Sequence, residues 1–374
     1  MSEQLDDLIF TLKKKIRVNH KSLTKVKNTT MLLNSLKDLR DMVGLSELKE
    51  SISLQTTMLI ELMGSDDELG MLNVILYGPP GVGKTKVAII LSRIWLSLGY
   101  LDDNGTTKEM IDTSGKYSQK LDTKSFVIPL LLLGGYIWAM CKYAYGIVGL
   151  LILPIIFLLV LLAMVGYSYS SSFIGENKIL DDQIVIVSRR DFVGDYVGQT
   201  AGKTRALLNK NLGKVIFIDE AYSLINGPMD SFGKEALTTL NLHMSMHPRR
   251  CVVIFAGYEK ELKNGVLKEQ PGLSRRCMWN FRCKGYNGEE LSEIFFRQMD
   301  KDGWIVTDKY DVIGLIENNI KLFSSYGGDT EKLGFYSKLD ASRNSFHSDK
   351  SSNKTLNINN IKIGLKYLRN NKNM

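Results

Sequence analysis

One segment, Asn73–Thr85 (NVILYGPPGVGKT), constrains the fold of this chain more than any other. Its run Val74–Tyr77 is apolar and rich in β-forming residues, and the eight residues that follow fit the pattern G-x-x-x-x-G-K-[ST] without a gap. A polyphosphate needs backbone N–H groups that converge on its oxygens, and glycines keep side chains out of their way. The helix expected from Lys86 to about Leu98 adds its positive N-terminal end. The pattern therefore predicts a strand, a phosphate-binding loop and a helix, in that order.

Two side chains of this loop have predicted roles toward a nucleoside triphosphate. Lys84 can reach the β- and γ-phosphates as a point charge, and the Thr85 hydroxyl can ligate Mg²⁺. The other contacts are expected from the rest of the loop and from the first turn of the helix. The full set of predicted contact residues in this segment is Gly78, Pro79, Pro80, Gly81, Val82, Gly83, Lys84, Thr85 and Lys86.

A second apolar strand, Val215–Ile218, ends in the two carboxylates Asp219 and Glu220. At the end of such a strand Asp219 can hold Mg²⁺ through water, and Glu220 can orient or deprotonate the attacking water. If residues 101–180 form an insert, the remaining chain from Lys84 to Asp219 is about as long as two βα units of roughly 30 residues each. Asp219 is therefore predicted to lie close to Lys84 and to be a second ligand of Mg²⁺.

The composition changes sharply in Phe126–Ser170, where Lys142 is the one charged residue. A bilayer crossing takes about 20 apolar residues, so this stretch is long enough for two crossings and a tight turn. Gly146–Gly166 is the stronger span and Phe126–Tyr145 the weaker one. We expect a transmembrane helical hairpin at about 126–168. A buried core hairpin is the alternative.

Two apolar strands that follow this stretch, Ile184–Val187 and Val215–Ile218, must join the sheet that contains Val74–Tyr77. One membrane crossing would leave them on the far side of the bilayer from Lys84, so the number of crossings must be even. Lysines flank the start of the stretch and favour a cytosolic side by the positive-inside rule, with Lys142 at the turn as a mild counter-signal; they are Lys116, Lys120 and Lys124. We therefore expect a membrane protein whose nucleotide-binding part lies on the cytosolic side.

The net charge of +8 is spread over separate short clusters, such as Lys13–Lys15, Arg249–Arg250 and Arg275–Arg276. Most of these clusters are expected on a solvated surface, so no nucleic-acid partner is predicted. His243 and His247 are four positions apart without a third ligand nearby, which favours a half-exposed helical face over a metal site. The cysteines have no CxxC spacing and indicate reduced thiols; they are Cys141, Cys251, Cys277 and Cys283.

The flanking segments have simpler patterns. The first 40 residues have the apolar spacing of two helices that pack together, and the acidic start Met1–Phe10 predicts no signal peptide. A helix is expected from Ser46, as its N-cap, to about Met63. Val252–Gly257 is typical of another buried strand. The glycines in Asp191–Thr200 favour a loop, either a turn packed on the sheet or one whose tip exposes Tyr196 and Val197 to a partner.

These motifs together resemble AAA+ ATPases of the CbbX/CfxQ group, which includes red-type Rubisco activases and stage V sporulation protein K. The resemblance covers about 41–100 and 181–300. The segments that carry it are DMVGL (41–45), YGPPGVGKT (77–85), LGY (98–100), SRRDFVGDYVGQTAGKT (188–204), VIFIDEAYSL (215–224), GKEAL (233–237), VVIFAGY (252–258) and QPGLSRR (270–276).

The resemblance implies a ring, expected to be a hexamer, that binds ATP with Mg²⁺ between its subunits. It places Val43 and Gly44, with Leu45, near the adenine. It implies that a central pore loop grips a protein client through Tyr196, Val197 and Gly198. It makes Arg276, next to Arg275, the arginine that stabilises charge on a neighbour's γ-phosphate; a solvated arginine pair is the alternative.

The expected architecture is an α/β P-loop AAA+ domain with a parallel sheet. Residues 1–40 are expected to form N-terminal helices, 41–100 and 181–288 the ATPase core, 101–180 the insert with the apolar hairpin, and 289–374 a helical lid. In the lid, Glu290–Met299 and Ile361–Leu368 have helical patterns, and the Ser/Asn/Lys-rich residues 342–357 predict a flexible loop.

Three features depart from the group's pattern. Tyr258 stands where many AAA+ proteins have a sensor asparagine, and Lys332 is a weak substitute for the sensor arginine of the lid. The apolar hairpin is foreign to the activases. The leading hypothesis is a membrane-anchored ATPase that remodels a protein client, and the second is an ATP-dependent membrane scaffold with little mechanical activity. A nucleic-acid motor is a third, weaker hypothesis.

Overall fold

The computed structural model describes residues 3–63, 72–101, 184–248, 250–347 and 354–372, which fall within one compact unit. The predicted hairpin at 126–168 lies outside the described residues and stays a prediction. Within the described ranges, no helix combines the length and the apolar character that a bilayer crossing demands.

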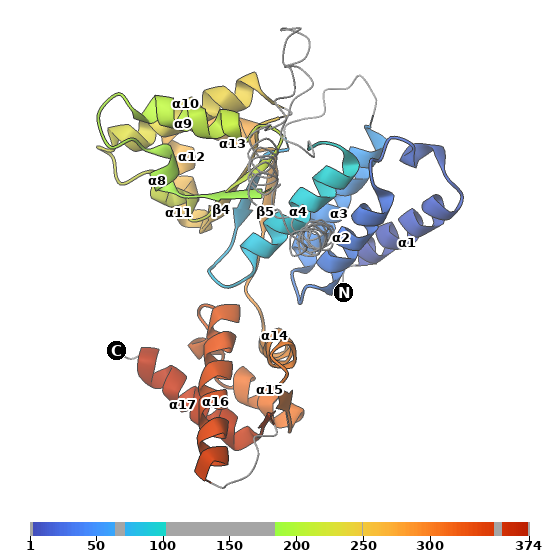
Figure 1. The fold of residues 1–374 in the computed structure, drawn as a ribbon, viewed down its shortest axis with the longest axis vertical. Helices are drawn as coiled ribbons and strands as arrows, with labels where there is room; N and C mark the ends of the chain where they lie inside the picture. The colour runs from blue at the N-terminus through green and yellow to red at the C-terminus, as the bar shows by residue number, and fades with distance from the viewer. Residues whose placement is uncertain (1–2, 64–71, 102–183, 249, 348–353, 373–374) are drawn as a thin grey trace, which may run out of the picture. The chain divides into compact units, whose positions relative to one another are not determined.

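A parallel five-stranded sheet forms the centre of the fold, in the order β2-β3-β4-β1-β5. Its strands are β1 Val74–Tyr77, β2 Ile184–Val187, β3 Val215–Ile218, β4 Val252–Gly257 and β5 Trp279–Arg282. The first four are the strands predicted from the sequence, and each is an apolar run of the kind that parallel sheets bury on both faces. Figure 1 shows helices on both sides of the sheet. The expectation of a parallel α/β fold is confirmed.

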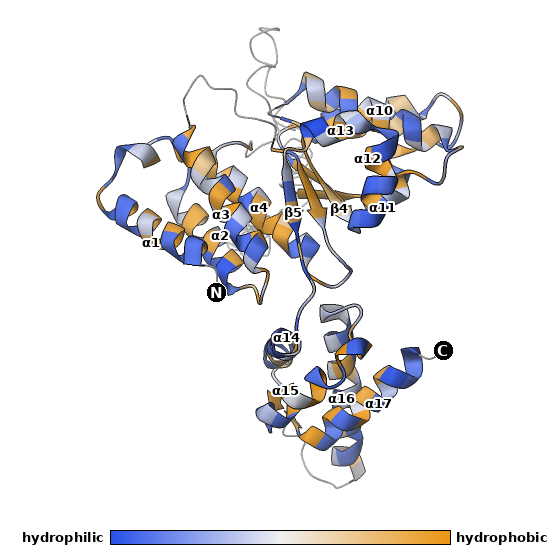
Figure 2. Cartoon of the chain, turned by 180° about the vertical axis from the view of Figure 1, so that it is seen from behind, coloured by the Kyte–Doolittle hydropathy of each residue, from blue (hydrophilic) through white to orange (hydrophobic). Residues whose placement is uncertain are grey.

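Alternate residues of the strands face two separate hydrophobic clusters. In β1, Val74 and Leu76 belong to one cluster, whereas Ile75 and Tyr77 belong to the other. This division follows from the period of two along a strand. Figure 2 shows the strands as an apolar centre between helices that turn polar residues outward.

The cluster around Val74 and Leu76 is covered by the N-terminal helices and the helix after the phosphate loop. These are α1 Glu3–Arg17, α2 Thr29–Asp41, α3 Ser46–Glu61 and α4 Lys84–Leu98. All leucines of α1 and α2 except the partly buried Leu33 are buried, so the predicted packing of these two helices is confirmed. The predicted N-cap of α3 was wrong by one residue: Leu45, in a left-handed conformation, precedes the helix, and Ser46 is its first residue.

The cluster around Ile75 and Tyr77 is covered by a series of shorter elements. These are α8 Arg189–Phe192, α9 Thr200–Lys210, η2 Ala221–Leu224, α10 Ser231–Met246, α11 Glu259–Asn264, α12 Val266–Glu269 and α13 Pro271–Arg276. The two groups of helices pack on opposite faces of the same sheet. The loops that follow the carboxyl ends of its strands therefore lie between these two groups of helices.

The C-terminal part is helical, as predicted. It comprises α14 Gly288–Lys301, β6 Ile305–Val306, α15 Lys309–Glu317, η3 Ile320–Leu322, α16 Gly327–His347, β7 Thr355–Leu356 and α17 Ile358–Lys372. The predicted loop at 342–357 was wrong in two places, because α16 continues to His347 and Thr355–Leu356 pairs with β6. Polar residues at the exposed end of a helix have the same composition as a loop, so composition alone could not separate the two.

Candidate functional site

The phosphate loop joins β1 to α4. Gly81 and Gly83 have φ angles of +73° and +87°, a left-handed conformation that favours glycine. Gly83 is the N-cap of α4 and provides no side-chain cap to the helix, so the first N–H groups of α4 are not satisfied by a capping side chain. Gly78 lies so close to β5 that an added Cβ would come within 2.8 Å of the Cys283 carbonyl oxygen. A converging set of N–H groups at a helix start is the chemistry that phosphate oxygens require.

Lys84 is the first residue of α4, and its ammonium lies over the loop. Its Nζ donates to the carbonyl oxygens of Gly78 (3.1 Å) and Pro79 (2.9 Å). Burial lowers the pKa of Lys84, and the negative charge of Asp219 opposes this change. Thr85 is half-buried in the same turn and Lys86 is exposed.

Asp219 and Glu220 follow β3 at the sheet edge that also carries the phosphate loop. Because β3, β4 and β1 are adjacent and parallel, their carboxyl ends meet at one edge. The strand order therefore places Asp219 and Glu220 at the edge that carries Lys84, and the charges of both carboxylates oppose the lowering of the Lys84 pKa. Thr85 and Asp219 fit a Mg²⁺ ion in chemical type, since hydroxyl and carboxylate oxygens are ligands that Mg²⁺ prefers.

Glu220 has an unusual backbone. Its φ of +48° is left-handed, which costs a non-glycine residue of order 1–2 kcal/mol. Its N–H donates to Asp219 Oδ1 at 3.0 Å, and its side chain is exposed. Strained residues of this kind cluster at functional sites, where the surroundings hold them in place.

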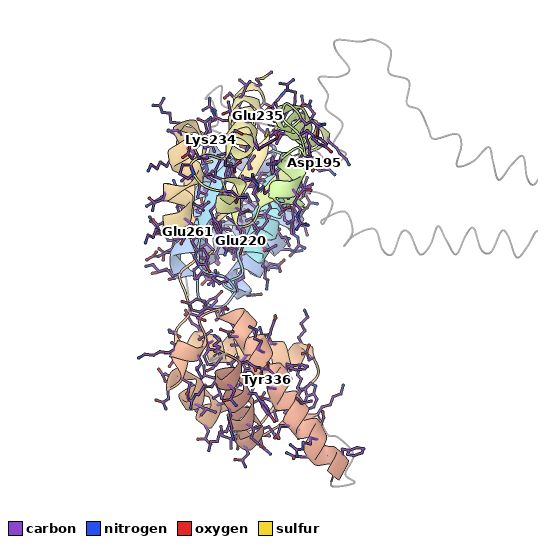
Figure 3. The ribbon with its side chains drawn as sticks, turned by 90° about the vertical axis from the view of Figure 1, so that its left-hand side faces the viewer. Asp195, Glu220, Lys234, Glu235, Glu261 and Tyr336 are labelled. Carbon is purple, nitrogen blue, oxygen red and sulfur yellow. The ribbon has the colours of Figure 1, made fainter. Side chains whose placement is uncertain are left out.

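Tyr222 lies beside Glu220, and Tyr258 lies beside Tyr222. The rings of Tyr222, in η2, and Tyr258, at the end of β4, are 6.0 Å apart between centroids. Burial, followed by the charge of Glu220, raises the pKa of the Tyr222 hydroxyl to about 12, and Glu261 adds to this effect. Figure 3 labels Glu220 and Glu261 at the same end of the sheet domain. Tyr222 was not predicted as a site residue, although it lies only two positions after Glu220.

The segment with Val43 and Gly44 connects α2 to α3. Gly44 and Leu45 both have left-handed backbones, at φ of +60° and +59°. The buried ammonium of Lys49 donates to two carbonyl oxygens at the end of α2, Arg40 (3.0 Å) and Met42 (2.6 Å). Burial lowers the pKa of Lys49. Lys49 therefore fixes the start of this segment, a role that the sequence analysis did not predict.

The two arginines at the end of α13 have different surroundings. Arg276 is half-buried and donates from Nε to Ser245 Oγ (2.6 Å) and from a terminal nitrogen to the Gly272 carbonyl oxygen (2.9 Å). Arg275 is exposed. Within one chain, hydrogen bonds thus fix the side chain of Arg276, whereas the side chain of Arg275 is exposed to solvent.

The loop between α8 and α9 has the exposed apolar tip that its glycines indicated. The side chains of Tyr196 and Val197 are 72% and 90% exposed, and Gly198 follows with a left-handed φ of +84°. The base is closed, because the N–H of Gly194 donates to Thr200 Oγ1 at 3.1 Å.

The other residues that the sequence analysis singled out have contacts within their own chain or are buried. Lys332 lies in α16 with its Nζ 3.6 Å from the buried carboxylate of Asp329. Burial lowers the pKa of His243 to about 4, and its ring forms a hydrogen bond with Asn209 Oδ1 at 2.9 Å. The predicted half-exposed position is found for His247, whereas His243 is buried. No group of three metal-ligating side chains occurs among the residues that the structure describes. The described cysteines are free and buried, and burial raises each thiol pKa to about 12; they are Cys251, Cys277 and Cys283.

Comparisons with known proteins agree with this geometry. Residues 171–269 match the family model described as ATPase family associated with various cellular activities (AAA). The cfxQ-like protein R730 of Acanthamoeba polyphaga mimivirus is 26% identical over 366 residues, which cover 96% of this chain and 70% of that protein.

Two bacterial relatives match shorter segments. Stage V sporulation protein K of Bacillus subtilis is 40% identical over 129 residues, which cover 34% of this chain and 40% of that protein. Protein CbbX of Cereibacter sphaeroides is 35% identical over 141 residues, covering 36% of this chain and 45% of that protein. The matches thus span less than half the length of these two relatives. Residues 171–269 thus resemble the AAA family model, and together with these relatives this match supports ATP hydrolysis as the activity of the domain built on the parallel sheet.

Proposed function

We propose that this protein is a membrane-anchored ring ATPase that remodels a protein client. One observation supports the proposal: the residues proposed for ATP hydrolysis follow β1 and β3 at one edge of the sheet, and the same domain exposes an apolar loop tip at Tyr196 and Val197. A large exposed aromatic side chain next to an exposed aliphatic one is typical of an interaction site. The client is proposed to be an extended polypeptide segment.

The residues at the sheet edge have proposed roles in hydrolysis. Thr85 and Asp219 would hold Mg²⁺, which supplies charge neutralisation between the phosphates when it is bound. Lys84 and the N–H groups of the loop bind and orient the phosphates. Glu220 orients the attacking water and accepts its proton. Val43 and Gly44 lie in the segment proposed to contact the adenine.

The proposed assembly is a ring, with six subunits as the expected number. AAA proteins typically form rings, and a neighbour's arginine then completes each site. The resemblance favours Arg276 for this role. The exposed side chain of Arg275 is the alternative, because Arg276 is bonded within its own chain.

We expect Tyr196→Ala to abolish the response of the ATPase to a polypeptide. Casein, which lacks a stable fold, is the probe: it should raise ATP hydrolysis by the unchanged protein and have no effect on the variant. Removing the ring from an exposed tip should leave ring assembly unchanged by sedimentation. Tyr310→Ala, at a tyrosine that is 91% exposed in α15, is the matched control and should respond like the unchanged protein.

The result also separates the proposal from the scaffold hypothesis. A scaffold would bind ATP and assemble, but casein would not stimulate it, and Tyr196→Ala would change nothing. Equal stimulation of the variant and the unchanged protein would show that this loop does not contact the client. The altered position Tyr258 motivates the scaffold alternative.

We expect the protein to stay in the membrane pellet on carbonate extraction, because residues 126–168 supply two apolar spans. Replacing 126–168 with a short Gly/Ser linker should release the protein while it keeps its ATPase activity, since the strands on either side belong to the same sheet. Extraction of the unchanged protein by carbonate would rule out the anchor. Loss of ATPase activity in the linker variant would favour the buried core hairpin instead.

A further inference from the structure

A partly buried ion pair connects α8, the helix that precedes the proposed client loop (residues 193–199), to the segment that follows Glu220. Arg189, the first residue of α8, donates two parallel hydrogen bonds to Asp230, at 2.6 Å to Oδ2 and 3.0 Å to Oδ1. The same guanidinium also donates to the Leu224 carbonyl oxygen at the end of η2. The side chain of Asp230 is only 6% exposed. A bidentate arginine–carboxylate pair fixes distance and orientation together.

The carboxylate of Asp230 is fully satisfied. Besides Arg189, it accepts from the backbone N–H groups of Asn226 (2.7 Å) and Gly233 (2.9 Å), and so caps α10. Burial alone would raise the pKa of Asp230, but the bonds from Arg189 and the two N–H groups lower it to about 2. The pair is therefore charged at neutral pH. A Cβ on Gly233 would come within 2.3 Å of the Leu224 oxygen, so the surrounding packing is tight.

On one side, the pair is connected through α8 to the base of the client loop. Lys203 Nζ donates to the carbonyl oxygens of Arg190 (2.7 Å) and Val193 (2.8 Å), and Thr204 Oγ1 donates to that of Phe192 (2.9 Å). These bonds tie α8 to α9 at the point where the loop begins. A displacement of Arg189 must therefore move the loop that carries Tyr196.

On the other side, the pair holds the segment after the catalytic carboxylate. The helical turn η2 begins at Ala221, directly after Glu220, and ends at Leu224, and both of these residues are buried. Because the turn is short and buried at both ends, a displacement of the Glu220 backbone should also displace Leu224. Arg189 bonds the end of this turn directly.

Glu220 and the client loop lie apart. Figure 3 shows Asp195, in the loop, toward the end of the sheet domain that carries Lys234 and Glu235, and Glu220 toward the other end. A change at the nucleotide site therefore needs a physical connection to reach the loop. Arg189 is the first residue of α8, the helix that precedes the loop, and its guanidinium donates to the Leu224 carbonyl oxygen at the end of the turn after Glu220.

We infer that Arg189 and Asp230 form a positioning pair that transmits the state of the nucleotide site, through η2, to the client loop at 193–199. The inference rests on the proposed function, since it assumes that ATP binds beside Glu220. Neither residue touches the nucleotide in this role. Binding changes the position of Glu220 and η2, and the rigid arginine fork carries that change to α8.

Hydrogen exchange on the full-length protein in detergent tests the inference without a client. The exchange rate of a peptide covering 193–199 is compared with and without the hydrolysis-resistant analogue AMP-PNP and Mg²⁺. In the unchanged protein we expect the nucleotide to shift this rate by about threefold or more. In Arg189→Gln the analogue should bind with its dissociation constant within about twofold, whereas the shift at 193–199 should disappear.

Two further variants serve as a conservative substitution of Arg189 and as a control outside the client loop. Arg189→Lys retains the charge but loses the planar fork, so its shift should be less than half that of the unchanged protein. It decides the matter if Arg189→Gln does not fold. Glu269→Gln breaks the Lys234–Glu269 ion pair (3.1 Å), which does not involve the client loop, and should behave like the unchanged protein.

The contrary outcomes are distinct. A full shift at 193–199 in a folded Arg189→Gln, or in Arg189→Lys if Arg189→Gln does not fold, would overturn the inference. So would an unchanged protein that binds AMP-PNP without any change at 193–199. Failure of the unchanged protein to bind AMP-PNP would overturn the proposed nucleotide site, and the coupling with it.

Discussion

Replacing Lys84 with alanine should weaken ATP binding by about 10²-fold or more. Truncating one member of a close charge pair costs roughly 2–5 kcal/mol, and every 1.4 kcal/mol is tenfold in affinity. Lys84 is the cation of the phosphate loop, and its ammonium already lies over the loop carbonyls of Gly78 and Pro79. The measurement is the dissociation constant of a fluorescent ATP analogue with Mg²⁺.

A matched lysine distinguishes a local effect from a change in net charge. Lys210, exposed in the last turn of α9, loses the same charge on substitution with alanine, and its variant should bind ATP normally. Lys84→Ala should also retain a cooperative thermal transition, because the loop conformation depends on the backbone of Gly81 and Gly83. An unchanged ATP affinity in Lys84→Ala would refute the proposed site.

The sequence predicted the four strands that are continuous apolar runs, including β2 at one edge of the sheet, and missed β5 at the other edge. β1 to β4 are continuous apolar runs, which few other structures explain. β5 reads Trp279-Asn280-Phe281-Arg282, and its alternation places Asn280 and Arg282 toward solvent. So short a mixed segment has no pattern that separates it from a loop. It belongs to the sheet because it pairs with β1, a contact between segments far apart in the sequence.

The same distinction holds for the site. Gly78–Thr85 is a contiguous motif, and its spacing alone indicates phosphate chemistry. Lys49 could not be found this way, since a lysine in an amphipathic helix normally faces solvent and only the fold shows its ammonium on the carbonyls at the end of α2. Arg189 and Asp230 are 41 positions apart and carry no spacing signal. Residues that position a site are thus harder to predict than residues that form it.

Replacing Glu220 with glutamine should slow ATP hydrolysis by about 10²- to 10⁴-fold, the usual contribution of a general base. Glutamine keeps the size of the side chain but cannot accept the proton of the attacking water. Asp219 and Lys84 remain at the same sheet edge, so ATP should bind with little change in affinity. The measurements are the turnover number at saturating ATP and the dissociation constant of the same fluorescent analogue.

Glu261→Gln is the control that isolates the role of Glu220 from its charge. Glu261 is exposed on α11, and both carboxylates act on the pKa of Tyr222, so either substitution removes a negative charge from the same surroundings. If the charge alone mattered, both variants would slow hydrolysis to a similar degree. If Glu220 acts as the base, only Glu220→Gln should hydrolyse ATP slowly, and Glu261→Gln should have a normal turnover number. A normal turnover number in Glu220→Gln would exclude Glu220 as the base. At saturating ATP the turnover number does not depend on ATP affinity, so the loss of the proton acceptor must appear as slower hydrolysis.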